Sequence, residues 1–415
     1  MWKYRSKSHL LALLISFFVG CGLGYLSLQS GTDIYEDVYP AEVIQFIQQN
    51  HLIVCLASGL SIAGIINIIR LTEYFATRWN FSPILVILLV FLLPDALLMI
   101  GVVTILPAAI ASLIGIYQLH KEKGSYGSNH ASSDEEIVRL YQLHHPLQED
   151  MCLLGQACRK NAIKIRCIYA LGVVAAICVI FFIQSITLII AAFLLFVFAF
   201  NIILRYKSTN ELPIISLLVQ KCDPVACVSA ILYYSQGKRK TKIQMHIPLA
   251  QCLIYMDDPA LAQDVLALMP RKDRMSNIQY WTIMSYIYYL LKDEKSLERC
   301  KEELGKMNKS MGFSNVFVPS EEMGVVQNKI DLMNGELNVC RKYYLNSLKR
   351  ARFPFQQVEA SYFIGLISFV EEDYPVAELY FNKVVSMGNR MCFVEKAQKY
   401  LDKLNQMDLS EQSVE

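Results

Sequence analysis

Long uncharged apolar runs before residue 206 constrain this 415-residue chain more than any other feature. The hydrocarbon core of a bilayer is about 30 Å thick, so a spanning helix needs about 20 mostly apolar residues. Residues 10–28 and 52–71 each meet that requirement directly. Beyond residue 206 the sequence is richly charged, which predicts a domain outside the membrane.

Two further apolar regions are too long for a single crossing. Residues 81–119 would form a helix of about 58 Å, roughly twice the core thickness, so they must turn back. Pro94–Asp95 is the predicted turn, because proline breaks a helix and aspartate can cap the next one. Residues 167–204 pose the same problem, and we expect them to turn near Gln184–Ser185. Six passes result.

The distribution of charge agrees with six passes. Basic residues precede the first span: Lys3, Arg5 and Lys7. The loop over 29–50 is acidic and lacks Lys and Arg, which suits the outside by the positive-inside rule. Two crossings within 81–119 place the basic residues of 120–166 inside. We therefore predict a multi-pass protein of the cell membrane with cytoplasmic N- and C-termini.

Two alternatives concern single residues of the membrane region. Lys3 to Phe18 also resembles a signal sequence, and Cys21 follows a loose lipoprotein box. Apolar residues continue to Leu28, which favours an uncleaved span in which Cys21 packs among glycines. Asp95 could mark an ion or proton pathway, but its place at the required turn favours the headgroup zone.

The chain therefore divides into four parts by sequence. These are a four-pass membrane region over 1–119, a cytosolic linker over 120–166, a transmembrane hairpin over 167–206, and a cytosolic helical domain over 207–415. Within the linker, Ser133 and the acidic residues after it predict a capped helix start. A second amphipathic stretch leads into the fifth pass. The predicted class is all-α.

Beyond Leu212 the pattern is helical nearly everywhere, with short breaks. Prolines stand in the first turn of predicted helices, where the missing N–H costs least: Pro224, Pro259 and Pro375. Second helices begin with a recurring small residue: Ala226, Ala262, Ser296, Cys340 and Ala377. Their separations, between 34 and 44 residues, are typical of two-helix repeats that stack into solenoids, each hairpin contacting mainly its neighbours.

Here the chain resembles the tetratricopeptide repeat family. The best-fitting repeat is Val358–Met391, with Gly365 at the family's first-helix glycine, Ala377 at its small residue and Phe381 at the aromatic residue that follows. The small residue lets two helices approach closely, and the aromatic ring fills the gap to the next hairpin. The resemblance implies a cytosolic α-solenoid after the membrane region.

The resemblance covers roughly Leu212–Leu404, and this chain departs from the family at several positions. Ser361 replaces the family's tryptophan and Asn389 its terminal proline. In the repeat around Ser296, Cys300 stands at the aromatic position, whereas the repeat around Cys340 retains an aromatic residue there, Tyr344. The repeat class is therefore better defined than its register.

In this family the first helix of each pair lines a concave groove that binds proteins or peptides. Carried onto this chain, the groove positions are Trp281, Ser285, Tyr288 and Tyr289, then Glu359, Tyr362, Leu366 and Phe369. The aromatic members Trp281, Tyr288, Tyr289, Tyr362 and Phe369 are the predicted partner-binding residues. The alternative is that these rings pack against neighbouring helices, as Tyr and Trp readily do.

A dense basic turn follows the first hairpin of the helical domain: Lys238, Arg239, Lys240 and Lys242. It lies about thirty residues past the last span, and each basic residue near an anionic leaflet contributes about 1 kcal/mol. The turn is therefore a predicted membrane-surface contact, with a solvated loop as the alternative. A formal net charge of +2 gives no overall attraction to nucleic acid.

No phosphate-binding loop, nucleophile elbow, zinc-protease motif or dinucleotide fingerprint occurs in the sequence. We therefore expect no cofactor, metal or enzymatic activity, and no small-molecule substrate can be identified. The leading hypothesis is a membrane-anchored scaffold or adaptor that binds a protein partner through its helical domain, with the lipid bilayer as its other partner. The alternative is a regulatory membrane subunit of a transporter or envelope-biogenesis complex.

Overall fold

The computed structural model describes residues 2–29, 42, 45–46, 49–79, 94–125, 131–182, 186–237, 240–308 and 320–412. Every regular element in these ranges is a helix, which confirms the all-α class. The chain divides into two compact units. The first comprises residues 1–127, 270–281 and 302–322, and the second comprises residues 128–269, 282–301 and 323–415.

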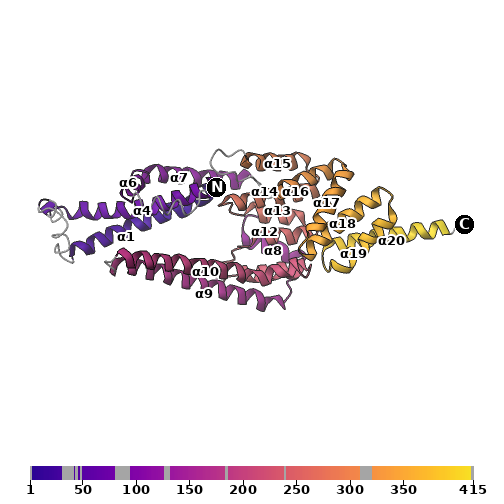
Figure 1. Ribbon diagram of the computed structural model, residues 1–415, viewed down its shortest axis with the longest axis horizontal. Helices are drawn as coiled ribbons and strands as arrows, with labels where there is room; N and C mark the ends of the chain where they lie inside the picture. Colours follow the sequence, from indigo (N-terminus) through magenta and orange to yellow (C-terminus); the bar gives the residue numbers. More distant parts are fainter. Residues whose placement is uncertain are drawn as a thin grey trace. The chain divides into compact units, whose positions relative to one another are not determined.

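The membrane region of the first unit contains four described helices: α1 (Trp2–Gln29), α4 (His51–Trp79), α6 (Pro94–Val103) and α7 (Ile105–Ser125) (Figure 1). Helix α1 packs against both α4 and α7, and α4 packs against α6. Trp2–Leu26 and His51–Phe75 are long and apolar enough to cross a membrane. These two correspond to the first and second predicted passes.

Glycines allow α1 and α4 to approach closely. A Cβ on Gly20 would lie 2.7 Å from the Ser58 carbonyl oxygen and 2.8 Å from Gly59 Cα. Small residues at helix contacts are typical of membrane bundles, where close backbone approach replaces the hydrophobic driving force. Cys21 also lies at this contact, beside Gly59, as the packing alternative for that residue predicts.

The described residues thus contain two helices that meet the spanning requirement, rather than the six expected. Residues 81–93 of the third predicted pass lie outside the described part of the chain. The fourth pass corresponds to α6 and α7, with a break at Thr104, and the turn predicted at Pro94–Asp95 adjoins residues outside the described part of the chain. The side chains of 173–197, on which the fifth and sixth passes depend, also lie outside the description.

The second unit contains the remaining helices, some of which also reach into the first (Figure 1). They are α8 (Asp134–His144), α9 (Met151–Phe182), α10 (Ile186–Val219), α11 (Pro224–Ser235), α12 (His246–Tyr255), α13 (Pro259–Ala267), α14 (Arg274–Leu290), α15 (Glu294–Asn308), α16 (Ser320–Met333), α17 (Leu337–Arg350), α18 (Pro354–Val370), α19 (Tyr374–Met387) and α20 (Cys392–Gln412). Helices α14, α15 and α16 cross the boundary between the units.

The same turn joins the two helices of successive pairs. Its central residue has a positive φ: Asp257, Lys292, Gly335 and Glu372. In each turn that residue's N–H bonds the carbonyl three residues back, and the next N–H bonds the carbonyl five residues back. This is the Schellman pattern, which satisfies the last carbonyls of a helix. An acidic residue follows in every case: Asp258, Asp293, Glu336 and Asp373. The turn recurs every 35 to 43 residues.

The predicted small residues lie mostly inside the second unit. Ala262, Cys340 and Ala377 are fully buried, and Ala226 nearly so, whereas Ser296 is half-buried. A Cβ on Gly365 would lie 2.9 Å from Cε1 of Phe381, so glycine lets this ring reach the α18 backbone. The repeat interpretation itself stays a prediction.

The predicted linker helices pack within the second unit. Ser133 caps α8, because the Glu136 N–H bonds its hydroxyl at 3.3 Å. Asp134 Oδ2 accepts from the Ile243 N–H at 3.0 Å, and Glu135 Oε1 accepts from the Thr241 N–H at 3.1 Å. The acidic start of α8 therefore holds the loop before α12.

Segments far apart in the sequence also meet inside this unit. The Asn389 amide donates to the Lys221 carbonyl at 2.8 Å, and Lys396 pairs with Asp257 at 2.6 Å. The ring of Tyr255 lies 5.8 Å from that of Phe393. Contacts between helices adjacent in sequence, such as α18 with α19, are therefore supplemented by contacts between distant hairpins. Several helices converge on shared aromatic and charged side chains.

Candidate functional site

The predicted groove residues do not form an open aromatic surface. Trp281, in the first unit, is 6 % exposed and lies edge-on to Tyr280 at 5.0 Å. Tyr362 is 8 % exposed and stacks on Phe393 of α20 at 4.7 Å. Phe369 is half-buried, with its ring 4.9 Å from Tyr400.

Tyr288 and Tyr289 are half-buried, and Tyr289 lies 6.4 Å from Phe363. The aromatic positions on α18 are therefore occupied by the protein's own helix α20. The binding of a partner at these residues stays a prediction.

The predicted basic turn is partly outside the description. Lys238 and Arg239 lie outside the described residues, whereas Lys240 and Lys242 are exposed. The Lys242 N–H bonds the Ser235 carbonyl at 3.1 Å, which fixes the backbone and leaves the side chain free to extend. The membrane-surface role of this turn stays a prediction.

A charged cluster that the sequence interpretation missed lies at the centre of the second unit. Lys329 of α16 is 2 % exposed, and its Nζ lies 3.6 Å from Glu359 Oε1 of α18. The same Nζ donates to the Tyr344 hydroxyl at 3.1 Å and lies 3.6 Å from the Tyr286 ring centroid. The Tyr255 hydroxyl donates to Glu359 Oε2 at 2.8 Å. These five residues, the lysine cluster, come from five helices.

Burial controls the chemistry of the lysine cluster. Loss of hydration lowers the pKa of the Lys329 ammonium to about 8, and the attraction of Glu359 opposes that fall. Burial also raises the pKa of Tyr286 and Tyr344, so both stay protonated. At neutral pH the cluster is therefore an ion pair surrounded by aromatic rings.

The geometry of the lysine cluster suits a structural role. Each polar atom of the pair has a partner inside the unit, and aromatic faces attract an ammonium group. Removing one partner of such a pair leaves an uncompensated charge, which costs several kcal/mol. The lysine cluster therefore favours the packing in which α12, α14, α16, α17 and α18 meet, because only there do these polar atoms have their partners.

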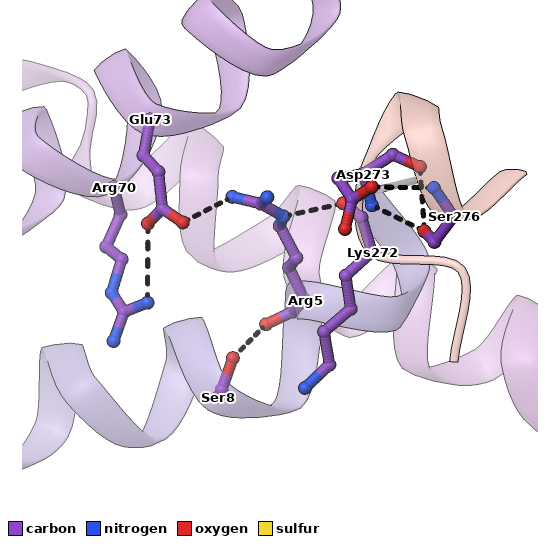
Figure 2. Close-up of polar contacts among 7 residues, drawn as sticks. All are labelled: Arg5, Ser8, Arg70, Glu73, Lys272, Asp273 and Ser276. Atoms are coloured by element: carbon purple, nitrogen blue, oxygen red, sulfur yellow. Dashed lines mark hydrogen bonds and ion pairs between the residues drawn. The ribbon is translucent and has the colours of Figure 1, made fainter. Parts of the chain in front are cut away.

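A second polar group lies at the start of α1 (Figure 2). Arg5 Nη1 pairs with Glu73 Oε1 of α4 at 2.9 Å, and Arg70 pairs with Glu73 Oε2 at 3.6 Å. Arg5 Nε also donates to the Lys272 carbonyl at 2.8 Å. One guanidinium thus bonds both the neighbouring apolar helix α4 and the segment before α14.

Neighbouring residues complete this contact, which we call the α1 junction. The Arg271 guanidinium donates to the Tyr4 hydroxyl at 2.7 Å and lies 4.2 Å from the Tyr280 ring centroid. Asp273 begins α14 in a reciprocal cap, because its Oδ1 accepts from the Ser276 N–H at 2.7 Å and its own N–H bonds the Ser276 hydroxyl at 3.2 Å. The capped start of α14 therefore contacts the first turn of α1.

Comparison with protein-family models, with curated proteins and with solved structures gives no match. The resemblance to tetratricopeptide repeats therefore rests on this chain's own residues. Among the described residues, no group of three or more His, Cys, Asp and Glu side chains is placed to hold a metal ion.

The first unit also buries a neutral network, here the histidine network. His9 of α1 is 2 % exposed, with its Nε2 3.2 Å from Asn67 Oδ1 of α4. Asn67 Nδ2 donates to the Gly101 carbonyl at 2.8 Å and to Thr104 Oγ1 at 3.0 Å. Pro107, which cannot donate, accounts for the break between α6 and α7. The network therefore supplies hydrogen bonds beside that break.

Sequence signals for these missed residues exist but are weak. Asn67 is a polar residue inside the second predicted span, and His9 immediately precedes the first, which is the strongest such signal. Lys329 falls at a position of α16 that a helical pattern alone does not distinguish from the exposed side. Only the three-dimensional convergence of five helices reveals that its ammonium is enclosed.

Proposed function

We propose that this protein is a membrane-anchored scaffold whose helical domain holds a protein partner at the cytosolic surface. Two apolar helices long enough to span a membrane support the anchoring. Successive helix pairs joined by one recurrent turn support the repeat-like domain, since stacked pairs present extended surfaces suited to proteins.

The α1 junction is the observation that carries the topology of this proposal. Tyr4 and Arg5 precede the apolar part of the first span and bond Arg271 and Lys272, which follow every predicted span. Residues in direct contact lie on one side of a bilayer. The junction therefore supports an even number of crossings between residues 5 and 271, with both segments on the same side of the membrane; six passes fulfil this condition, and so do two.

Photocrosslinking in native membranes tests this topology. A photoreactive side chain at position 4 is expected to crosslink, within one chain, to the peptide that contains Arg271 and Lys272. The matched control is position 25, a tyrosine near the other end of α1. Reporter fusions after Lys123 and at Glu415 should both be cytosolic. An exported signal at either fusion would refute the six-pass arrangement.

The partner itself is sought with the intact chain. Crosslinking in membranes, followed by identification of what co-purifies with residues 207–415, is expected to recover a protein in stoichiometric amount. The same experiment is repeated with a folded Tyr362→Ala variant. A protein that co-purifies with this variant as well as with the unmodified chain binds outside the predicted groove. If nothing co-purifies under conditions that preserve membrane complexes, the scaffold proposal fails.

The histidine network favours the second candidate, a regulatory membrane subunit. An ionisable residue inside a span is costly and commonly functional. His9→Leu separates the two candidates because it removes the ionisable group and leaves the helical domain intact. A scaffold keeps its partner and the partner's activity in this variant. A regulatory subunit keeps the partner but changes that partner's activity.

A further inference from the structure

The last described helix, α20, covers the predicted groove residues of α18. Helix α20 packs on both α18 and α19. Tyr362 stacks on Phe393 at 4.7 Å, and Tyr400 lies 4.9 Å from Phe369 and stacks on Phe381 at 5.1 Å. Two of the residues expected to bind a partner, Tyr362 and Phe369, are therefore in contact with a helix of the same chain.

Helix α20 is amphipathic in a regular way. Its buried residues follow helical spacing: Phe393, Ala397, Leu401 and Leu404. Between Phe393 and Gln406 its exposed residues are polar or charged: Glu395, Gln398, Lys399, Asp402, Lys403, Asn405 and Gln406. This pattern is that of a helix that lies in a groove, with anchors at positions i, i+4, i+8 and i+11.

The attachment of α20 differs along its length. The first turn reaches the interior, where Phe393 lies 5.8 Å from Tyr255, and Lys396 forms an exposed pair with Asp257. Exposed pairs of this kind contribute little. Farther along the helix, Tyr400 contacts the ring of Phe369 on α18 and that of Phe381 on α19. Release of this later part would leave the turns between the earlier helices unchanged.

We propose that the surface formed by α18 and α19 is a helix-binding site, and that α20 is its displaceable occupant. The partner that fits is an amphipathic helix with an aromatic residue followed by Ala, Leu and Leu at the spacing of α20. This inference rests on the proposed scaffold function and specifies its partner. In the resting chain the site is closed by α20, which accounts for the burial of Tyr362.

A labelled peptide with the sequence of residues 389–412 tests the proposal on the full-length protein in nanodiscs. Fluorescence anisotropy measures its affinity. Leu401→Glu in the chain weakens the docking of the chain's own α20 and is expected to tighten peptide binding at least tenfold relative to the unmodified chain. Gln398→Glu is the matched control, because it adds the same charge on the exposed side of α20. A peptide with Leu401→Glu should not bind.

The outcomes are distinguishable. If Leu401→Glu keeps its helical content and hydrogen-exchange protection in α12 to α17 but binds the peptide no more tightly, the proposal is overturned. If Leu401→Glu unfolds the domain, Tyr400→Ala is the milder variant, and unfolding by both would show that α20 is an indispensable part of the core. If the unmodified chain forms a concentration-dependent dimer that is lost in Leu401→Glu, the helix that binds this site is α20 of a second copy and not that of another protein.

Failure of this test leaves the scaffold function itself open to its own test. The peptide experiment uses only the protein's own sequence, whereas the co-purification experiment uses the cellular partner. A partner that co-purifies while the peptide never binds would place the interaction on another surface of the helical domain.

Discussion

The lysine cluster and the histidine network are both buried polar groups, but they differ in charge and in what they bond. The lysine cluster pairs Lys329 with Glu359 and surrounds them with tyrosine rings. The histidine network links His9, Asn67 and Thr104 through neutral hydrogen bonds, and one of its partners is a backbone carbonyl. One cluster joins charges, and the other bonds polar groups beside a helix break.

The difference follows from the surroundings. In water, a buried ion pair tolerates its loss of hydration only when nearly every polar atom has a partner. In a bilayer, a charge is costly at any geometry, whereas a side-chain amide can bond a neighbouring backbone carbonyl, as Asn67 bonds that of Gly101. We therefore expect the free energy of unfolding to depend strongly on the lysine cluster and weakly on the histidine network.

The largest effect is expected for Glu359→Gln. Glutamine keeps the volume and an acceptor for the Tyr255 hydroxyl, so the change removes mainly the counter-charge of Lys329. Breaking a buried pair from one side costs about 3–5 kcal/mol. Denaturant unfolding of the purified protein, followed by hydrogen exchange on α16 and α18, measures the loss.

Two controls show whether charge is the cause. Adding Lys329→Met to Glu359→Gln removes the unpaired ammonium and should recover most of the lost stability. Glu395→Gln makes the same chemical change on an exposed side chain of α20 and should have no measurable effect. A Glu359→Gln variant as stable as the unmodified protein would contradict the role assigned to the pair.

A pH dependence is the next largest effect. The pKa of Lys329 is about 8 in the folded protein, against 10.5 without burial. Between these values the unfolded chain holds more protons, so the free energy of unfolding rises with pH, by at most about 1.4 kcal/mol per pH unit. Below pH 8 both states are protonated at this residue, and its contribution is constant.

Cysteine thiols oppose that rise. Burial raises the pKa of Cys222, Cys340 and Cys392 from 9.0 to about 11, so above about pH 9 the unfolded chain loses these protons first and the free energy of unfolding falls. The contribution of Lys329 is therefore measured as a difference between two proteins that share these thiols. Between pH 8 and 10 the denaturation midpoint of the unmodified protein should rise relative to that of the Lys329→Met, Glu359→Gln double variant. Parallel curves for the two proteins would exclude a contribution of Lys329 to the pH dependence.

Much of the local structure was predictable because it depends on neighbouring residues. The Asp-Pro pairs at 223–224 and 258–259 begin α11 and α13 with an aspartate cap, and Ser133 caps α8. Pro94 begins α6. These signals act within one turn of chain, so a single sequence contains them in full.

The convergence of distant helices was not predictable in the same way. Tyr362 reads as a groove residue from its repeat position, but α20 returns to cover it. The linker likewise packs into the helical unit, where Asp134 and Glu135 hold the loop before α12. Such contacts depend on the three-dimensional positions of the helices. Helix α10 runs from Ile186 to Val219 and so continues past the boundary predicted at residue 207. Helices α9 and α10 both contact α11.

The smallest expected effect belongs to the histidine network, and its size tests the contrast between the two regions. Asn67→Leu keeps the side-chain volume and removes the hydrogen bonds to Gly101 and Thr104. Interhelical hydrogen bonds in membrane proteins average about 0.6 kcal/mol and reach about 1.7 kcal/mol, because the unfolded chain in the bilayer finds other partners. We therefore expect a loss of about 1 kcal/mol in the free energy of unfolding.

His9→Leu, Asn67→Leu and the double variant form a mutant cycle whose coupling energy isolates the bond between the two side chains. Unfolding in mixed detergent micelles, followed by the fluorescence of Trp2, whose ring lies 5.0 Å from His9, measures all three variants. A loss as large as that of Glu359→Gln would mean that His9 carries a charge in the folded bundle, and the contrast between the two clusters would not hold.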